Sequence, residues 1–449
     1  MPAIVQLSPS GDTSGATDRA AINKAFRPGD QDISVQLGPG HWFTDQPLTP
    51  GNGNELAGVK GGVNGGTSTG PAGTVIHPAP RFSGSGVIDL ADGTHGCRVR
   101  DLAILNDLGT GPGVDGISCH RVVNGSQFQN LSIALVTGHG IAFHQGGDGK
   151  DGDGLKMRTV MIQKVGQNGV HRPVNDANIH DVHVQYAGQA GGTYRHGFYS
   201  TPGNSGNMSY IGCRADLCRG AGWVIDHQGT FGDATKLSGC STERNEGDGV
   251  LIDNTSATGS DWRDPVVIDG CCFEGDGTGG GDGGDYAAIR VRGRNRVHIS
   301  GTITAVNVVD IAAGAPKYAL YLQQAGSDNA VADVVEWASG RLNYSTGQKG
   351  EAVHNHSLAD RLIFGPSVTQ TPGFESGTDY TRSGQATLVN GQVTVTSPWV
   401  WPASQIIVST LVPVNSDRVW VDSRSDAAFV IKSTNRADGS TVAWLLTQL

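Results

Sequence analysis

A repeat of about 30 residues is the feature that most limits the fold of this 449-residue chain. The segments GCRAD, GCSTE and GCCFE share a Gly-Cys pair and an acid three residues after the cysteine. Their glycines extend to a series of turn residues at Asp101, Asn130, Thr159, Asp181, Gly212, Gly239, Gly270 and Gly301, at intervals of 22 to 31 residues. Such a period predicts a stack of equivalent structural units.

A second series of Gly-apolar segments interleaves with the first and begins at Gly116, Gly140, Gly169, Gly197, Gly222 and Gly249. Each period therefore holds at least two short strands separated by Gly, Asn and Asp turns. Strands this short cannot bury a face alone, so they must stack coil on coil. We therefore predict an all-β chain built on a right-handed parallel β-helix over residues 95–340.

Alternation along the strands predicts which repeated side chains lie inside. Cys213, Cys240 and Cys271 occupy one register and are expected to point inward as a column of small apolar groups. The acids lie at odd offset and are expected to form an outward strip of carboxylates. The seven cysteines of the chain lack zinc-site spacing, so we expect reduced, buried thiols.

The two ends of the chain differ from the repeat. Residues 1–94 are predicted to form an N-terminal cap with the first irregular coils, including a helix in SGDTSGATDRAAINKAF with Thr17 or Asp18 as N-cap. Residues 341–376 are predicted as the last coil and a linker. Residues 377–449 are predicted as an antiparallel β domain, with a hairpin turned at Asn390-Gly391 in a type I′ turn.

Charge and hydropathy exclude several classes of protein. The net charge of -10 and the pI of about 5.7 argue against a nucleic-acid-binding surface. No stretch approaches 18 apolar residues, so no membrane span is expected. The first residues show no charged segment followed by an apolar run, and we expect no secretion signal.

GDTSGATDRAAINKAF and VQLGPGHWFTDQPL resemble the N-terminal signature of the pectate-lyase-like β-helix superfamily, although Gly38 stands where proline is usual and Trp42 replaces tyrosine. The C-terminal strands resemble modules of phage tailspikes and tail fibres. This resemblance implies a homotrimeric tail protein, assembled in the host cytoplasm and carried on the virion. Its partners would be host surface polysaccharide and other tail proteins. Whether it cuts the polysaccharide stays open at this point. The alternatives are a stand-alone pectate-lyase-like or glycoside-hydrolase enzyme and a non-catalytic structural adhesion protein.

The carboxylate strip supplies the catalytic candidates Glu243, Asp216 and Glu274. Neighbouring rungs of a parallel sheet lie about 4.8 Å apart and alternate rungs about 9.6 Å. These values approach the separations of about 5–5.5 Å in retaining and about 6.5–9.5 Å in inverting glycosidases. The alternative interpretation is a solvated surface ladder of acids, partly neutralised by Arg214, Arg219 and Arg244.

Candidate substrate-binding residues are Arg214, Tyr186 and Tyr199. The tyrosines belong to an aromatic set that also includes Tyr194, Tyr210 and Trp223, for which packing in the core or in turns is the alternative. A lyase would need a base or a cation, and His183, Arg195 and Arg214 are available. His139 and His196, with Asn168 between them, each precede the glycine of a coil and are interpreted as a turn ladder.

We expect no cofactor and no metal. Asp148, Asp151 and Asp153 in GGDGKDGDGLK could ligate Ca²⁺, but their spacing is not that of an EF-hand. A glycine- and aspartate-rich surface loop is the favoured interpretation of this segment.

Overall fold

The structure is a computed structural model, and it divides the chain into two units, Met1–Phe374 and Glu375–Leu449. It describes residues 3–26, 32–59, 73–120, 123–144, 154–173, 176–200, 207–226, 234–254, 266–278, 286–293, 296–305, 318–323, 334–342, 351–355, 361–370, 383–396, 400, 405–410, 418–425, 428–435, 437 and 439–447.

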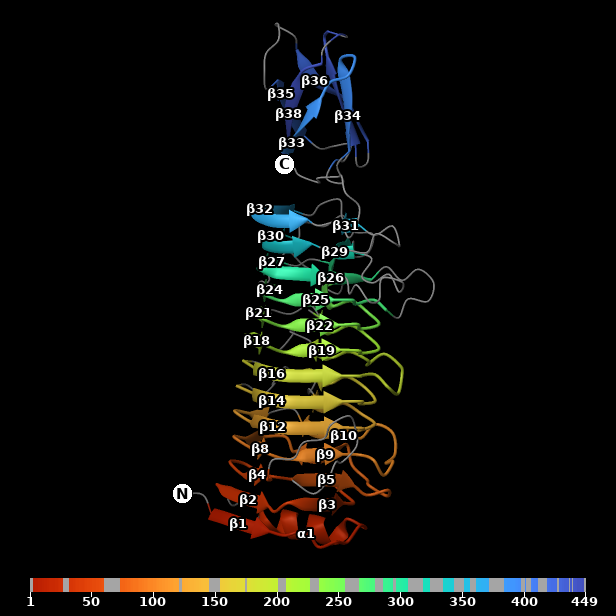
Figure 1. Ribbon diagram of the computed structural model, residues 1–449. Helices are drawn as coiled ribbons and strands as arrows, with labels where there is room; N and C mark the ends of the chain where they lie inside the picture. Colours follow the sequence, from red (N-terminus) through yellow and green to blue (C-terminus); the bar gives the residue numbers. More distant parts are fainter. Residues whose placement is uncertain are drawn as a thin grey trace. The chain divides into compact units, whose positions relative to one another are not determined.

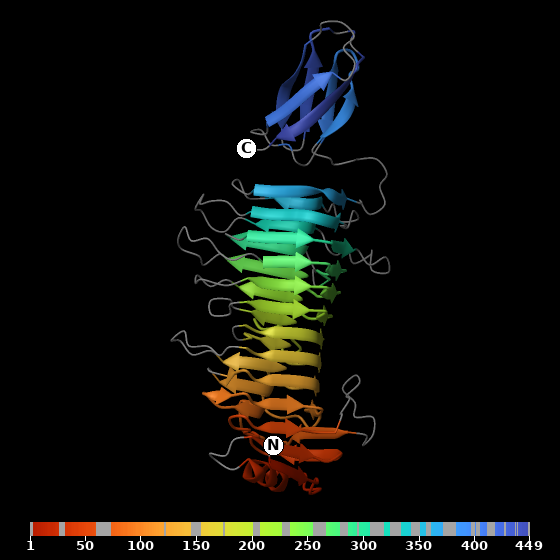
Figure 2. The same ribbon diagram turned by 90° about the vertical axis from the view of Figure 1, so that its left-hand side faces the viewer.

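The first unit is a parallel β-solenoid whose strands lie coil upon coil in three columns (Figures 1 and 2). The first column contains β1 (Ala3–Leu7), β2 (Ile33–Leu37), β4 (Glu55–Ala57), β8 (Arg98–Arg100), β12 (Gln127–Ala134), β14 (Lys156–Gln163), β16 (Asn178–Gln185), β18 (Met208–Ile211), β21 (Thr235–Ser238), β24 (Val266–Asp269), β27 (Arg296–Ser300), β30 (Val334–Leu342) and β32 (Arg361–Gln370).

The second column continues from the first around a bend and belongs to the same hydrogen-bonded sheet. It contains β3 (Gly40–Thr44), β5 (Thr74–Pro78), β9 (Ala103–Leu105), β19 (Arg214–Asp216), β22 (Ser241–Glu243), β25 (Cys272–Glu274), β28 (Thr302–Ala305) and the later halves of β12, β14, β16, β30 and β32.

The third column is a separate parallel sheet. It contains β6 (Gly86–Leu90), β10 (Asp115–His120), β13 (Ile141–His144), β15 (Val170–His171), β17 (Phe198–Ser200), β20 (Trp223–Asp226), β23 (Val250–Asn254), β26 (Ala287–Gly293), β29 (Tyr318–Gln323) and β31 (Glu351–Asn355). The short strands β7 (Thr94–His95) and β11 (Val123–Asn124) pair with each other.

The bend between the first two columns explains the first sequence series. All eight predicted turn residues have a positive φ, between 52° and 61°. Glycine adopts this left-handed conformation without steric cost, and aspartate and asparagine tolerate it better than other residues. The repeat is therefore confirmed residue by residue.

The second series has a different cause, which is close packing between coils. A Cβ placed on Gly222 would lie 2.8 Å from the carbonyl oxygen of Gly249 and 2.5 Å from Cγ2 of Thr242. Similar contacts of 2.6–2.7 Å with the carbonyl of the next coil occur at Gly116, Gly140, Gly169 and Gly197. These glycines allow the chain to enter the third column at the spacing of the stack.

The cysteine column lies inside the solenoid, as predicted, and its thiols have hydrogen-bond acceptors. Each sulfur lies 3.2–3.5 Å from a carbonyl oxygen of the preceding coil, in the pairs Cys213–Ile179, Cys240–Tyr210 and Cys271–Leu237. In the next coil Thr302 donates its hydroxyl to the carbonyl of Ile268 at 3.4 Å. The column therefore needs a small side chain with one donor.

The predicted helix is present as α1 (Ala16–Ala25), but the predicted N-cap is wrong. Gly15 is the N-cap and provides no side-chain cap. Asp18 is buried within the first turn instead, where it accepts hydrogen bonds from the backbone N–H groups of Ser10 at 2.8 Å and Phe43 at 3.0 Å. Its carboxylate therefore ties α1 to β3 and does not start the helix.

The second unit is an antiparallel β domain with two three-stranded sheets. One contains β33 (Ser383–Thr387), β38 (Thr441–Thr447) and β35 (Gln405–Thr410), and the other β34 (Gln392–Thr396), β37 (Ala428–Ser433) and β36 (Val419–Ser425). Asn390 and Gly391 have φ of 54° and 75°, as a type I′ turn requires. Val389 and Gln392 pair antiparallel across this turn, with reciprocal backbone hydrogen bonds of 2.9 and 3.2 Å, as the predicted hairpin requires. The pairing ends there, because β33 and β34 belong to different sheets.

Candidate functional site

The outward faces of β16, β19, β22 and β25 bring the predicted acids into one row. Gln185, Asp216, Glu243 and Glu274 are in register on four successive coils, after Gln163 on the coil before. A neighbouring row, two residues earlier on each strand, places His183 beside Arg214. The repeat alone therefore positions acid, base and guanidinium groups together.

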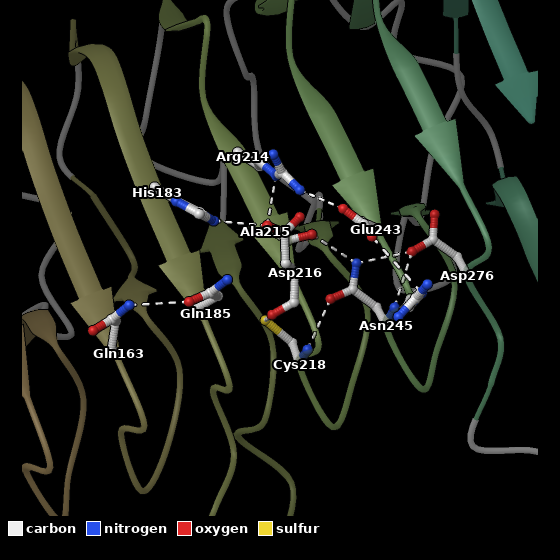
Figure 3. A network of polar contacts seen from close by, with 11 residues as sticks. Gln163, His183, Gln185, Arg214, Ala215, Asp216, Cys218, Glu243, Asn245 and Asp276 are labelled. Carbon is white, nitrogen blue, oxygen red and sulfur yellow. Dashed lines mark hydrogen bonds and ion pairs between the residues drawn. The ribbon is translucent and has the colours of Figure 1, made fainter. Parts of the chain in front are cut away.

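Asp216 is the centre of a polar network on these strands (Figure 3). Its Oδ2 accepts hydrogen bonds from Nε2 of His183 at 2.7 Å and from Nε of Arg214 at 2.5 Å. A terminal nitrogen of Arg214 also donates to Glu243, whose other oxygen lies 3.7 Å from Nε of Arg244. The Oδ1 atom of Asp216 is buried and has no hydrogen-bond partner among the described residues.

The three acids differ in exposure, which corrects the prediction of a uniform outward strip. The side chain of Asp216 is only 2% exposed, whereas that of Glu243 is 33% exposed. Glu274 is half-buried. His183 and Arg214 both bond to Asp216 and lie between it and solvent, so its outward position does not make it accessible.

Arginines neutralise the acids, as the alternative interpretation expected. Arg214 bridges Asp216 and Glu243, so these two carboxylates do not face each other as a repelling pair. Arg244 approaches Glu243 from the other side, while Arg219 is exposed. Glu243 is also in register with Glu274 on the next coil.

A second, fully buried polar cluster lies behind this row in the turn after β25 (Figure 3). Asp276 accepts hydrogen bonds from the backbone N–H of Asn245 at 3.2 Å, from its Nδ2 at 2.8 Å and from the hydroxyl of Thr242. Burial raises the pKa of Asp276 to about 7. The cluster holds the turns of successive coils together and is closed to solvent.

The predicted aromatic set divides between core and surface. Tyr210 and Trp223 are fully buried, as the packing alternative expected, whereas Tyr186 and Tyr194 are each 38% exposed. Tyr199 is half-buried in the third column and donates its hydroxyl to Asp226 at 2.8 Å. The structure therefore places Tyr199 on a different sheet from the row of acids.

Tyr199 belongs to a stack of rings that sequence reasoning found only in part. The ring stack comprises His139, His171, Tyr199 and His196, with centroid separations of 4.1 Å for His139–His171, 5.4 Å for His171–Tyr199 and 5.9 Å for His196–Tyr199. The turn ladder predicted at His139 and His196 is thus a stack of aromatic rings. His171 was missed because it lies on a strand and has no equivalent in the turn series; its register with Tyr199 is the signal that identifies it.

Burial makes the imidazoles of the ring stack poor bases. It lowers the pKa of His139 to about 3, of His171 to about 2 and of His196 to about 4. Desolvation disfavours the charged imidazolium, and neighbouring cations add to this effect. The three rings are therefore neutral at physiological pH.

The structure offers no metal centre among the residues that it describes, where no group of three or more His, Cys, Asp or Glu side chains could hold an ion. The candidate calcium ligands Asp148, Asp151 and Asp153 lie outside the described residues. In the described part of the chain, no helix has the length and apolar character needed to cross a membrane.

Comparison with known proteins adds a family match at one end of the chain. Residues 380–447 match the model of the family described as K1 capsule-specific polysaccharide lyase, C-terminal domain. This match covers most of the second unit and none of the solenoid. None of the curated proteins matches the chain.

Several solved structures share the architecture at low sequence identity. The catalytic domain of a GH87 α-1,3-glucanase, solved in complex with tetrasaccharides, has a TM-score of 0.50 and 13% identity over 83% of this chain and 69% of its own. The A-module of mannuronan C-5 epimerase AlgE6 from Azotobacter vinelandii has a TM-score of 0.47 and 16% identity, over 81% and 97%. The Gp54 tailspike of Acinetobacter baumannii bacteriophage AP22, solved with a capsular saccharide, has a TM-score of 0.45 and 11% identity over 97% of this chain and 93% of its own.

The predicted fold is confirmed by the strands themselves and by the likeness to the glucanase domain. The structural neighbours include polysaccharide-degrading β-helix proteins and phage tailspikes, and the C-terminal unit is similar to the last domain of a capsule lyase.

Proposed function

We propose that this protein is a phage tail component, a tailspike or tail fibre, that binds and depolymerises a polysaccharide of the host surface. Two findings support the proposal. The C-terminal unit is similar to a domain of a capsule-specific lyase, and the solenoid has the fold of a glucanase that was solved with tetrasaccharides. The cleavage site is the row on β16, β19, β22 and β25.

The observation that carries the proposed chemistry is the bond between His183 and Asp216. Because Nε2 of His183 donates to the buried carboxylate at 2.7 Å, the lone pair lies on Nδ1. His183 is 25% exposed, so that Nδ1 can act as a base on a sugar in the row. Asp216 is too buried to touch substrate and acts as a positioning residue.

This arrangement favours β-elimination on an acidic sugar. Nδ1 of His183 takes the proton from the carbon next to the sugar carboxylate, a carbon–carbon double bond forms, and the glycosidic carbon–oxygen bond breaks. The departing oxygen takes a proton from water. Arg214 is 45% exposed, and its guanidinium can hold the sugar carboxylate through N–H groups not used by Asp216 and Glu243.

Hydrolysis is the second candidate, and the register of Glu243 with Glu274 favours it. Carboxyl groups on adjacent coils lie near the strand spacing of about 4.8 Å. This is close to the separation of about 5–5.5 Å in retaining glycosidases. Glu243, at the centre of the row, would then be the catalytic carboxylate.

The products distinguish the two chemistries. We expect the full-length protein, incubated with a panel of acidic capsular polysaccharides, to release fragments that carry an ultraviolet-absorbing double bond. His183→Ala should lower this rate by about 100-fold or more, the contribution typical of a general base. His180→Ala, on the same strand and also half-buried, is the matched control and should leave the rate unchanged.

Products with new reducing ends but no double bond would show that the reaction is hydrolysis and not elimination. An undiminished rate in Glu243→Gln would then exclude Glu243 as the catalytic carboxylate. Binding without any product would identify a non-catalytic adhesion protein and refute the depolymerase. The proposed homotrimer is tested by light scattering on the purified chain, where about 140 kDa is expected from a subunit of 46.6 kDa. A monomer would favour the stand-alone enzyme.

A further inference from the structure

The ring stack offers a second surface whose chemistry the row of acids does not use. His171 and Tyr199 are in register on β15 and β17 of the third column. His139 and His196 lie in the turns that lead into the same column. The row of acids lies on the second column, so the two surfaces belong to different sheets.

The tautomer of all three imidazoles is fixed by their hydrogen bonds. Nδ1 of His139 accepts from the backbone N–H of Asn168 at 3.1 Å, and Nδ1 of His196 accepts from that of Ala221 at 3.0 Å. The side-chain oxygen of Asn168 accepts from the N–H of His196 at 2.8 Å, so its amide nitrogen is the donor to Nδ1 of His171 at 2.9 Å. Each neutral ring therefore carries its proton on Nε2.

The three Nε2–H groups are unused donors. No residue that the structure describes accepts a hydrogen bond from them, and none of them is among the buried polar atoms without a partner. His139 and His171 are buried as whole residues, whereas His196 and Tyr199 are partly exposed.

Tyr194 adds an exposed aromatic wall beside these donors. Its ring lies edge-on to His139, His171 and Tyr199, with centroid separations of 5.6, 5.0 and 6.2 Å. One apolar ring thus stands at a steep angle to a stack that presents N–H groups. This combination suits a ligand with one apolar face and several oxygen acceptors.

We propose that the ring stack and Tyr194 form a second saccharide-binding site that takes an uncharged pyranose unit. The sugar oxygens accept hydrogen bonds from the Nε2–H groups, and the apolar face of the ring packs on Tyr194. The choice of a sugar as ligand rests on the proposed function. The site holds the chain of the polysaccharide and takes no part in its cleavage.

Because the donors are uncharged, binding is expected to be nearly independent of salt and of pH between about 5 and 8. The three imidazoles become protonated only near pH 2–4. The charged groups around the stack are Arg172 and Arg195, the ion pair of His144 with Asp115, and Asp226, which accepts from Tyr199.

The test uses the full chain with maltohexaose, cellohexaose and chitohexaose as uncharged probes and oligogalacturonate as the acidic one. Histidine side-chain NMR should show the Nε2–H tautomer for all three rings, and at least one uncharged probe should shift their signals. Tyr194→Ala should weaken that binding about tenfold or more. Trp420→Ala removes a similarly exposed aromatic side chain from the second unit and should not.

The outcome is separable from that for the proposed function. Glu243→Gln and His183→Ala should leave binding of the uncharged probe unchanged, and Tyr194→Ala should not abolish cleavage of a polysaccharide supplied in excess. The inference is overturned if no uncharged probe shifts the three imidazoles, if only oligogalacturonate does, or if Tyr194→Ala binds as tightly as the parent protein.

Discussion

The buried carboxyl of Asp276 should make the stability of the solenoid depend on pH. It is fully buried, and burial raises its pKa from 3.8 to about 7 against the opposing effect of hydrogen bonds from Thr242 and Asn245. Asp276→Asn keeps the shape of the side chain. Its oxygen can accept from Asn245 and its amide can donate to the hydroxyl of Thr242, so the variant removes only the ionisation.

The sign follows from proton binding in the two states. Between about pH 4 and 7 the folded protein keeps the proton on Asp276 while the unfolded chain loses it, so the free energy of unfolding falls as the pH rises through this window. The pKa values differ by about three, and each unit corresponds to about 1.4 kcal/mol. The free energy of unfolding of the parent protein should therefore fall by about 4 kcal/mol, relative to that of Asp276→Asn, between pH 4 and pH 8.

Thermal unfolding at both pH values measures this difference. The unfolding entropy is about 2.1 cal/mol/K per residue, so this energy corresponds to about 5 °C for the Met1–Phe374 unit. The melting temperature of the variant minus that of the parent should therefore be about 5 °C larger at pH 8 than at pH 4. Asp181→Asn removes an exposed carboxylate and is the control for loss of surface charge. If Asp276→Asn gains nothing at pH 8 over pH 4, the burial argument is wrong.

Three further predictions concern the repeat. Gly222→Ala should lower the free energy of unfolding by about 1–3 kcal/mol or more, because its Cβ would lie 2.8 Å from the carbonyl oxygen of Gly249. Gly212→Asn should cost less than about 1 kcal/mol, because its Cβ meets nothing within 4 Å and Asn130 adopts the same left-handed conformation at the equivalent turn three coils earlier. Equal losses of the two variants in chemical denaturation would contradict this. In thiol titration of the folded protein only the half-buried Cys272 should react, and more than one fast thiol would refute the inward column.

The interior of the solenoid could be predicted from the sequence because stacked coils must place similar side chains at equivalent positions. The left-handed turn residues and the inward cysteines were found by their spacing alone, and both were confirmed. The turn at Asn390 was also found, but its flanking strands join different sheets. Local turn chemistry does not decide which sheet the following strand enters.

The candidate site was predictable only in part. Alternation placed Asp216 on the outer face, but it cannot show that His183 and Arg214 cover that carboxylate. The intervals between equivalent turns vary from 22 to 31 residues, so spacing alone does not identify the ring partners of His171. These partners come from turns as well as from strands. These contacts depend on side-chain directions and uneven loop lengths, neither of which a period records.

Repetition on the outside of a solenoid therefore needs no functional explanation, and a break in it does. A column of identical acids would repel itself, whereas unlike groups in register can bond across coils. His183 opposite Arg214 and His171 opposite Tyr199 are two such unlike pairs, and each is the nucleus of one proposed site. The informative residues are thus the outward ones that differ from their neighbours above and below, since the fold itself does not require them.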